Sequence, residues 1–260
     1  MPELPDVETY RKYLEATALH KAIVKVSVET DLLAGVSEKE LSKTLNNAKL
    51  ENTRRHGKHL FIRTSKGPWV GLHFGMTGFL KYYEKPEEKP EHVRLLLAFS
   101  NGYRLAYDCQ RKLGAIRIID DPDEFIEDND LGPDALADDM DFETFRDIIR
   151  GSRGYIKSTL MSQKDIAGLG NVWSDEILYQ AGIHPKKKIG QLDDGQLRKL
   201  YDTMLDVLDK GIRAGGDTAK MPDGFLTPLR GTDSECPCGG KVEKISVSGR
   251  NAVYCPRCQT

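Results

Sequence analysis

The stretch that fixes the fold of the C-terminal region is Cys236-Pro237-Cys238 together with Cys255-Pro256-Arg257-Cys258, with 16 residues between the two cysteine pairs. Residues 241–248 and 251–254 have the composition of two strands, joined by the turn Ser248-Gly249-Arg250. Two short knuckles that bring four thiolates together suit a tetrahedral zinc ion. The pattern predicts a zinc ribbon that holds one structural Zn²⁺ through Cys236, Cys238, Cys255 and Cys258.

Two alternatives to zinc stay open for these cysteines: a pair of disulfides, or reduced structural thiols. The first knuckle also departs from the usual pattern, because it has one residue between its cysteines where two are usual. Four of the five cysteines crowd into the last 25 residues, and the N-terminal sequence does not resemble a signal peptide. Both features favour metal binding in a reducing, cytoplasmic compartment. Four sulfur ligands leave no position for water, so a structural role is expected for the zinc. Cys109 is interpreted as a thiol at the end of a strand.

The ribbon, expected over residues 236–260, follows a region of helical pattern at residues 135–235. Helical spacing is clear around Phe142 to Ile149 and around Leu197 to Leu208. Residues 156–184 predict two or three short helices. From residue 214 onward the chain is rich in glycine and proline, which is typical of a loop.

The N-terminal part, residues 1–120, predicts a β-sandwich or barrel flanked by helices. An amphipathic helix is expected from Val7 to Leu19, and a second over 38–45, where Ser37 and Glu40 match a capping box. The segments with strand patterns are 23–28, 59–63, 69–73, 78–83, 93–99, 103–107 and 115–119. Between the two parts, the acidic stretch 121–134 is predicted to be a linker. The fold class is therefore α+β.

The net charge of −2 conceals an uneven distribution. Residues 120–147 contain 13 acidic residues and one arginine, whereas the remainder of the chain carries 27 acidic and 37 basic residues. A basic body of this kind can hold phosphate, although charges spread over a solvated surface are the simpler alternative. No run of apolar residues is long enough to span a membrane.

The N-terminus, Met1-Pro2-Glu3-Leu4-Pro5-Asp6, offers a possible nucleophile. Removal of Met1 would expose Pro2 as a secondary amine, and an α-amino group titrates near pH ~8, well below lysine. Such an amine can attack a sugar carbon and form an iminium. Glu3 is the nearest possible proton donor. By itself, a proline near an N-terminus is usually inert.

Four segments, in order, together resemble the formamidopyrimidine-DNA glycosylase and endonuclease VIII family. They are the N-terminus, the basic turn 54–58, the segment 156–185 with its Gly168-Leu169-Gly170-Asn171 turn, and the cysteine hairpin with Gly249-Arg250. The resemblance implies a catalytic β-sandwich, a helix–two-turn–helix domain and a zinc ribbon. It also implies base-excision repair of damaged double-stranded DNA by a glycosylase that is also an abasic-site lyase.

The resemblance further implies residue roles. Pro2 would attack C1′ while Glu3 protonates the sugar ring, and β- and δ-elimination would nick the strand. Lys58 would contact phosphate near the lesion. Asn171 and Arg250 would grip the flanking phosphates, with Lys157 a weaker candidate, although Arg250 at the hairpin tip could equally be solvated. The gap left by the extruded base would be filled by Met76, Arg111 and Leu113.

Several positions depart from the family pattern. Asp6 stands where glutamate is expected, and Leu113 replaces an aromatic residue. Residues 215–234, including Asp217, Lys220, Met221 and Phe225, do not align with the loop that covers a flipped purine, so the lesion is left open. Outside this family, core packing would be the favoured interpretation of Met76.

Two other functions compete with the enzyme: a non-catalytic protein that binds damaged DNA, and an RNA-binding zinc module. The cysteines fit the RNA-binding module, but residues 1–113 do not. We expect a monomer without an obligate protein partner, associated with the nucleoid in the cytoplasm.

Overall fold

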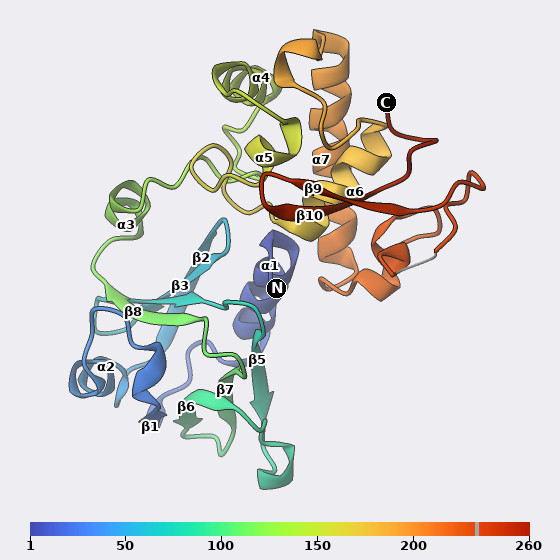
Figure 1. Ribbon diagram of the computed structural model, residues 1–260. Helices are drawn as coiled ribbons and strands as arrows, with labels where there is room; N and C mark the ends of the chain where they lie inside the picture. Colours follow the sequence, from blue (N-terminus) through green and yellow to red (C-terminus); the bar gives the residue numbers. More distant parts are fainter. Residues whose placement is uncertain (232–233) are drawn as a thin grey trace. The chain divides into compact units, whose positions relative to one another are not determined.

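The computed structural model describes residues 1–231 and 234–260 (Figure 1). The loop expected at 215–234 includes Thr232 and Asp233, which lie outside the described residues. The chain forms two compact units. The first contains Met1–Pro2 and Val7–Asn129, and the second contains Glu3–Asp6 and Asp130–Thr260. The predicted α+β class is confirmed, because the first unit is built on sheets and the second on helices.

Within the described residues, the first unit holds two four-stranded antiparallel sheets, with strand orders β1-β6-β7-β5 and β2-β3-β4-β8. The bounds are β1 Ile23–Val28, β2 Leu50–His56, β3 His59–Thr64, β4 Trp69–His73, β5 Gly78–Tyr83, β6 Val93–Phe99, β7 Arg104–Cys109 and β8 Ala115–Ile119. Each strand predicted from its alternation is present. Cys109 ends β7, as predicted, and the structure shows that it is fully buried.

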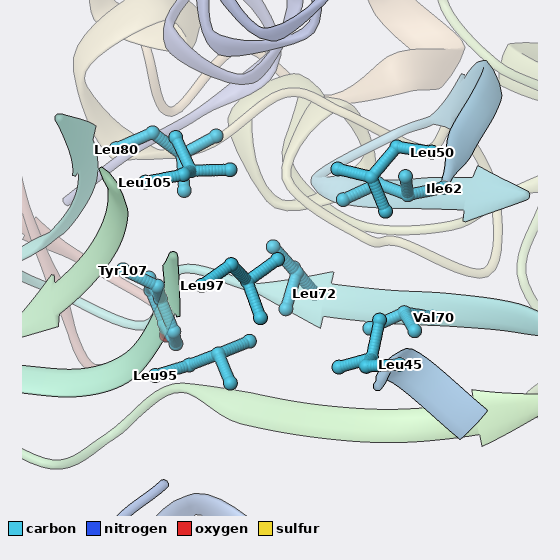
Figure 2. A pocket seen from close by; sticks show the side chains of 10 residues that line it. All are labelled: Leu45, Leu50, Ile62, Val70, Leu72, Leu80, Leu95, Leu97, Leu105 and Tyr107. Atoms are coloured by element: carbon cyan, nitrogen blue, oxygen red, sulfur yellow. The ribbon is translucent and has the colours of Figure 1, made fainter. Parts of the chain in front are cut away.

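Strand β2 was not predicted. Its sequence, Leu-Glu-Asn-Thr-Arg-Arg-His, contains one apolar residue, so periodicity does not reveal it. The strand forms because it pairs with β3 at the edge of the sheet. Apolar side chains of both sheets meet in the core, and Figure 2 shows leucines such as Leu72 and Leu97 converging on a small apolar cavity. With an almost wholly apolar lining, this cavity is a feature of packing.

Three α-helices lie within residues 1–129, all of which the structure describes. Helix α1 (Leu4–Thr17) and helix α2 (Glu38–Leu45) occur where they are predicted, and Ser37 and Glu40 form the expected capping box. Helix α3 (Pro122–Asp128) lies inside the acidic segment that was expected to link two domains. Asp121 caps α3, and Pro122 occupies its first turn.

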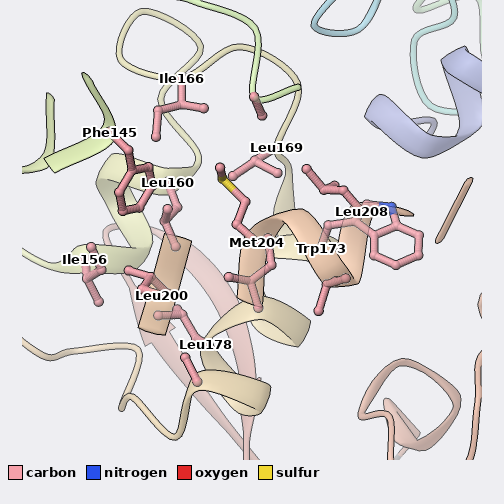
Figure 3. Close-up of a cluster of buried hydrophobic side chains, with 14 of the residues drawn as sticks. Phe145, Ile156, Leu160, Ile166, Leu169, Trp173, Leu178, Leu200, Met204 and Leu208 are labelled. Atoms are coloured by element: carbon pink, nitrogen blue, oxygen red, sulfur yellow. The ribbon is translucent and has the colours of Figure 1, made fainter. Parts of the chain in front are cut away.

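The second unit has a hydrophobic core to which four helices contribute: α4 Phe142–Gly151, α5 Ile156–Leu160, α6 Asn171–Ala181 and α7 Asp194–Arg213. Figure 3 shows Trp173 of α6 beside Leu208 of α7, with Phe145, Ile156 and Leu160 elsewhere in the same cluster. Residues 173–178 of α6 are all buried, including three polar ones. Helix α6 is therefore the central element of this unit.

The segment after α7 is packed against the same core. Met221 and Phe225 are 7% and 6% exposed. The carboxylate of Glu176 accepts hydrogen bonds from the backbone N–H groups of Leu226 (3.0 Å) and Thr227 (2.6 Å), which ties the segment to α6. Burial raises the pKa of Glu176.

Strands β9 (Glu243–Val247) and β10 (Arg250–Tyr254) form the predicted hairpin. Ser248 and Gly249 both have positive φ, 48° and 78°, which gives the two-residue turn that suits the twist of a hairpin. Helix α6 packs against β10.

Candidate active site

The carboxylate of Glu3 is fixed at the N-terminus of α6. It accepts hydrogen bonds from the backbone N–H groups of Gly170 (2.7 Å), Val172 (2.9 Å) and Trp173 (3.3 Å), and the side chain is 1% exposed. The first N–H groups of a helix have no partners within the helix, and the helix dipole places positive charge there. A single carboxylate therefore caps α6 and is held rigidly next to Pro2 in the chain.

The Gly168-Leu169-Gly170 turn is shaped for this contact. A Cβ atom at Gly168 would lie 2.6 Å from Leu4 Cδ1, and one at Gly170 would lie 2.8 Å from Glu3 Cγ and closer still to its carboxyl group. The amide of Leu4 also donates to the carbonyl of Gly168 at 3.1 Å. Glycine is required at both positions because the N-terminal segment approaches the turn so closely.

Asp6 supports the same segment. Its Oδ2 accepts a hydrogen bond from the amide of Glu3 at 2.9 Å, which is the amide that follows Pro2. Burial raises the pKa of Asp6 to about 6, with the nearby Glu3 charge acting in the same direction. A Cβ at Gly216 would lie 2.6 Å from Asp6 Oδ1, so the segment after α7 leaves only enough room for a glycine beside this carboxyl group.

Asn171 begins α6, directly after the residues that hold Glu3. Its side-chain oxygen is buried and has no hydrogen-bond partner among residues 1–231 and 234–260. Buried polar atoms in folded proteins nearly always have partners, so this oxygen is an acceptor that a donor group of a ligand could satisfy.

Lys58 lies in the turn between β2 and β3 and is 9% exposed. Gly57 takes the left-handed conformation (φ 54°) there, and its carbonyl accepts a hydrogen bond from Arg55 at 3.1 Å. His59 begins β3 after this turn and pairs with His73 at the end of β4, and the ring centroids of the two histidines are 5.0 Å apart. Burial lowers the pKa of His59 to about 3 and that of His73 to about 4, and the nearby cationic groups add to both shifts.

Met76, Arg111 and Leu113 lie on two loops that touch. The backbone of Leu113 packs against Gly75, and the amide of Arg111 donates to Thr77 Oγ1 at 3.1 Å. Met76 and Leu113 are 38% and 53% exposed, which places them among the few large apolar side chains of the described chain that face solvent. Core packing of Met76 is thus excluded. The structure brings together the three residues expected to fill the gap in the duplex.

The four cysteines of the ribbon converge on one point. Their sulfur atoms all lie within 4.8 Å of one another, with Cys236 and Cys258 at 3.6 Å and Cys238 and Cys255 at 3.5 Å. Disulfide bonds, at about 2.05 Å, do not fit these separations. Four sulfurs at about 2.3 Å from one zinc ion, in a tetrahedron, do fit them. The cluster is one structural zinc site, and the zinc would supply rigidity.

Arg250 is exposed at the start of β10. It lines a pocket with Lys157, Ser158 and Ser248, and the hydroxyls of the two serines lie 2.8 Å apart. The serine pair joins the hairpin tip to α5. The pocket is lined by two cationic residues and by hydroxyls, which suits an anion.

Lys157 is only 1% exposed, and its ammonium pairs with Asp175, which is fully buried. Asp175 also accepts hydrogen bonds from Arg230 (2.5 Å) and from the amide of Val253 (3.1 Å). Burial lowers the pKa of Lys157, whereas Asp175 acts against that shift. The burial of Lys157 weighs against a primary role in direct phosphate contact.

Sequence reasoning missed Asp175, Glu176 and Arg230, which hold α6 to the ribbon and to the segment after α7. Two adjacent acidic residues, Asp175 and Glu176, stand in a predicted helix among residues that are all buried in the structure. Acidic residues are common on exposed helix faces, so this pair indicates a structural role only once its burial is known.

Family models match three parts of the chain. They are the formamidopyrimidine-DNA glycosylase N-terminal domain over residues 1–116, the H2TH domain of the same enzymes over residues 131–223, and a zinc finger found in FPG and IleRS over residues 236–260. In the part of the chain that the structure describes, no helix is long and apolar enough to cross a membrane. The fold and the metal site thus define a zinc-ribbon DNA glycosylase of the helix–two-turn–helix class.

Individual relatives agree with this class. The formamidopyrimidine-DNA glycosylase of Haemophilus influenzae is 34% identical over 270 residues, covering 100% of this chain and 99% of the relative, and that of Geobacter metallireducens is 33% identical over 268 residues, covering 100% of each. A Lactococcus lactis enzyme bound to DNA with an abasic site superimposes with a TM-score of 0.88 at 29% identity, covering 99% of each chain. MutM in complex with DNA containing carbocyclic 8-oxo-G gives 0.89 at 30% identity, covering 100% of each. The chain belongs to the formamidopyrimidine-DNA glycosylase family.

Proposed function

We propose that this protein removes an oxidised purine from double-stranded DNA and then cleaves the strand at the resulting abasic site. The observation that carries the proposal is the burial of Glu3 against three N–H groups at the N-terminus of α6, which fixes the residue that follows Pro2. The carboxylate also caps α6, and its place directly after Pro2 in the chain is what favours an enzyme over a non-catalytic DNA-binding protein. The purine class is supported by the names of the relatives and by a Lactococcus lactis neighbour bound to Fapy-dG DNA.

In this mechanism, Met1 is removed and the Pro2 nitrogen attacks C1′ as the bond from C1′ to the base breaks. The C1′–O4′ bond then opens to give the iminium. Glu3 would pass the proton that the Pro2 nitrogen loses to O4′, and it is then a carboxylate that offsets the positive charge of the iminium. Asp6, with a pKa of about 6, can exchange a proton near neutral pH. Loss of the C2′ proton then expels the 3′ phosphate by β-elimination, and δ-elimination expels the 5′ phosphate. Hydrolysis of the iminium frees Pro2.

The DNA would be held by separate groups. Lys58, Asn171 and Arg250 would contact phosphates around the lesion, and Lys157 would contribute through its charge beneath the pocket of Arg250. Met76, Arg111 and Leu113 would fill the space of the extruded base. Leu113 is an apolar wedge, which fills space but stacks less well than an aromatic ring. We also propose that the protein acts as a monomer.

The test is borohydride trapping. Protein with a verified N-terminal proline is mixed with duplexes that carry 8-oxoguanine, ring-opened guanine, an oxidised pyrimidine or an abasic site. The matched control is the same protein with an N-terminal extension before Pro2, which lacks the secondary amine but keeps the fold. An adduct that forms only with free Pro2 supports the lyase. Binding to damaged duplexes without any adduct or nick would leave the damage-binding alternative.

A further inference from the structure

Tyr179, near the C-terminal end of α6, touches the zinc site. Its hydroxyl lies 3.1 Å from Sγ of Cys236, and the ring is half-buried, whereas Cys236 is 2% exposed. A cysteine that binds zinc is a thiolate without a proton, so the hydroxyl must be the donor of this hydrogen bond.

The short first knuckle explains why a donor from outside the ribbon matters here. Pro237 follows Cys236 and has no N–H group to offer to the sulfur. The amide of Gly240 donates to Cys238 at 3.4 Å, so the backbone of this knuckle serves the second cysteine. Within residues 1–231 and 234–260, Sγ of Cys236 receives a hydrogen bond from Tyr179, and its other close partner is Sγ of Cys258, itself a zinc ligand.

The second knuckle is tied to the same end of α6 by different groups. Gln259 donates to the carbonyl of Ile183 at 2.9 Å and accepts from the amide of Cys255 at 2.8 Å, while the amide of Thr260 donates to Gly182 at 3.1 Å. The C-terminal knuckle is thus attached to the segment after α6 by backbone and side-chain amide hydrogen bonds. The N-terminal knuckle is attached to α6 itself by the hydroxyl of Tyr179.

We propose that Tyr179 is a positioning residue for the zinc site, which holds Cys236 as a ligand by donating a hydrogen bond to its thiolate. A zinc ion with four thiolates carries net negative charge, and donors to the sulfurs offset it. The role concerns metal retention, and it does not depend on the glycosylase or lyase activity.

The experiment compares Tyr179→Phe with Tyr201→Phe in the full-length zinc-loaded protein. Tyr201 is the matched control because its hydroxyl, in the same unit, donates to the carbonyl of Met140 at 2.8 Å, away from the cysteines. Zinc transfer to a chromogenic chelator is followed at constant pH, and zinc content is measured by elemental analysis. Loss of such a partner typically weakens metal binding about 10–100-fold. We expect the zinc affinity of Tyr179→Phe to fall by that factor, and the zinc affinity of Tyr201→Phe to equal that of the wild type.

A second measurement separates the metal from the packing of the ring. The thermal midpoint of Tyr179→Phe should approach that of the wild type when zinc is added in excess, because phenylalanine keeps the ring in place. Equal zinc loss from the two variants would overturn the proposal. A Tyr179→Phe protein that stays destabilised or unfolded in excess zinc would overturn it as well, since the hydroxyl would then act on the fold directly.

Discussion

Substituting Gly170 by alanine should disable the site through a single steric contact. The backbone at Gly170 has φ −132° and ψ −156°, which alanine adopts without strain. The new Cβ would nevertheless lie 2.8 Å from Glu3 Cγ and closer to its carboxyl carbon, whereas carbon atoms prefer about 3.5–4.0 Å. Because Glu3 is 1% exposed, it can relieve the clash only by leaving the N-terminus of α6.

The magnitude follows from the bonds that this movement breaks. A retreat of about 1 Å takes the bonds from Gly170 (2.7 Å) and Val172 (2.9 Å) beyond hydrogen-bonding range. Each bond to a charged group contributes about 1.5–3 kcal/mol, and water would restore part of that. We expect a loss of about 3 kcal/mol in the free energy of unfolding, or about 6–12 °C in melting temperature.

The assay is a thermal melt of Gly170→Ala beside Gly190→Ala, combined with borohydride trapping on an abasic duplex. Gly190 is the matched control because an added Cβ there would meet no atom within 4 Å. Trapping should fall sharply in Gly170→Ala, because the residue that follows Pro2 is displaced. If both variants melt together and trap equally well, Glu3 is not held as the structure indicates and the reasoning fails.

Three further predictions concern other parts of the molecule. Leu113→Ala should leave the melting temperature unchanged, because the side chain is 53% exposed, yet weaken adduct formation on lesion-containing duplexes; a lowered melting temperature would contradict the wedge role. His59 has its pKa depressed to about 3, so the unfolded chain binds its proton first and stability should decline as the pH falls from about 6.5 toward 3; denaturant melts of His59→Phe should show a shallower decline than the wild type. Cys258→Ser should lose zinc and bind duplex DNA more weakly at equal salt, because the ribbon that carries Arg250 is no longer fixed; elemental analysis and a binding titration check this, and undiminished DNA binding by zinc-free protein would refute it.

How far the sequence predicts the fold depends on how much of the signal is local. Strands such as β4 and β6, rich in apolar residues, and helix α2 with its capping box were predicted because periodicity and caps lie within a few residues. Helix α3 carries a capping aspartate and a proline in its first turn, but its acidic composition favoured a linker. Strand β2 has no comparable pattern and exists through its partner β3.

The sequence by itself determined the zinc ligands and the family resemblance, because cysteine chemistry and short motifs are written in consecutive residues. Pro2 and Glu3 were candidates for the same reason. Only the tertiary structure decided that Glu3 caps α6, since its partners lie about 170 positions later in the chain. Likewise, the sequence did not show that Met76 is exposed or that Lys157 is buried in an ion pair with Asp175, and the structure shows both. Burial and long-range hydrogen bonds depend on how distant segments pack, and no local pattern of residues encodes that.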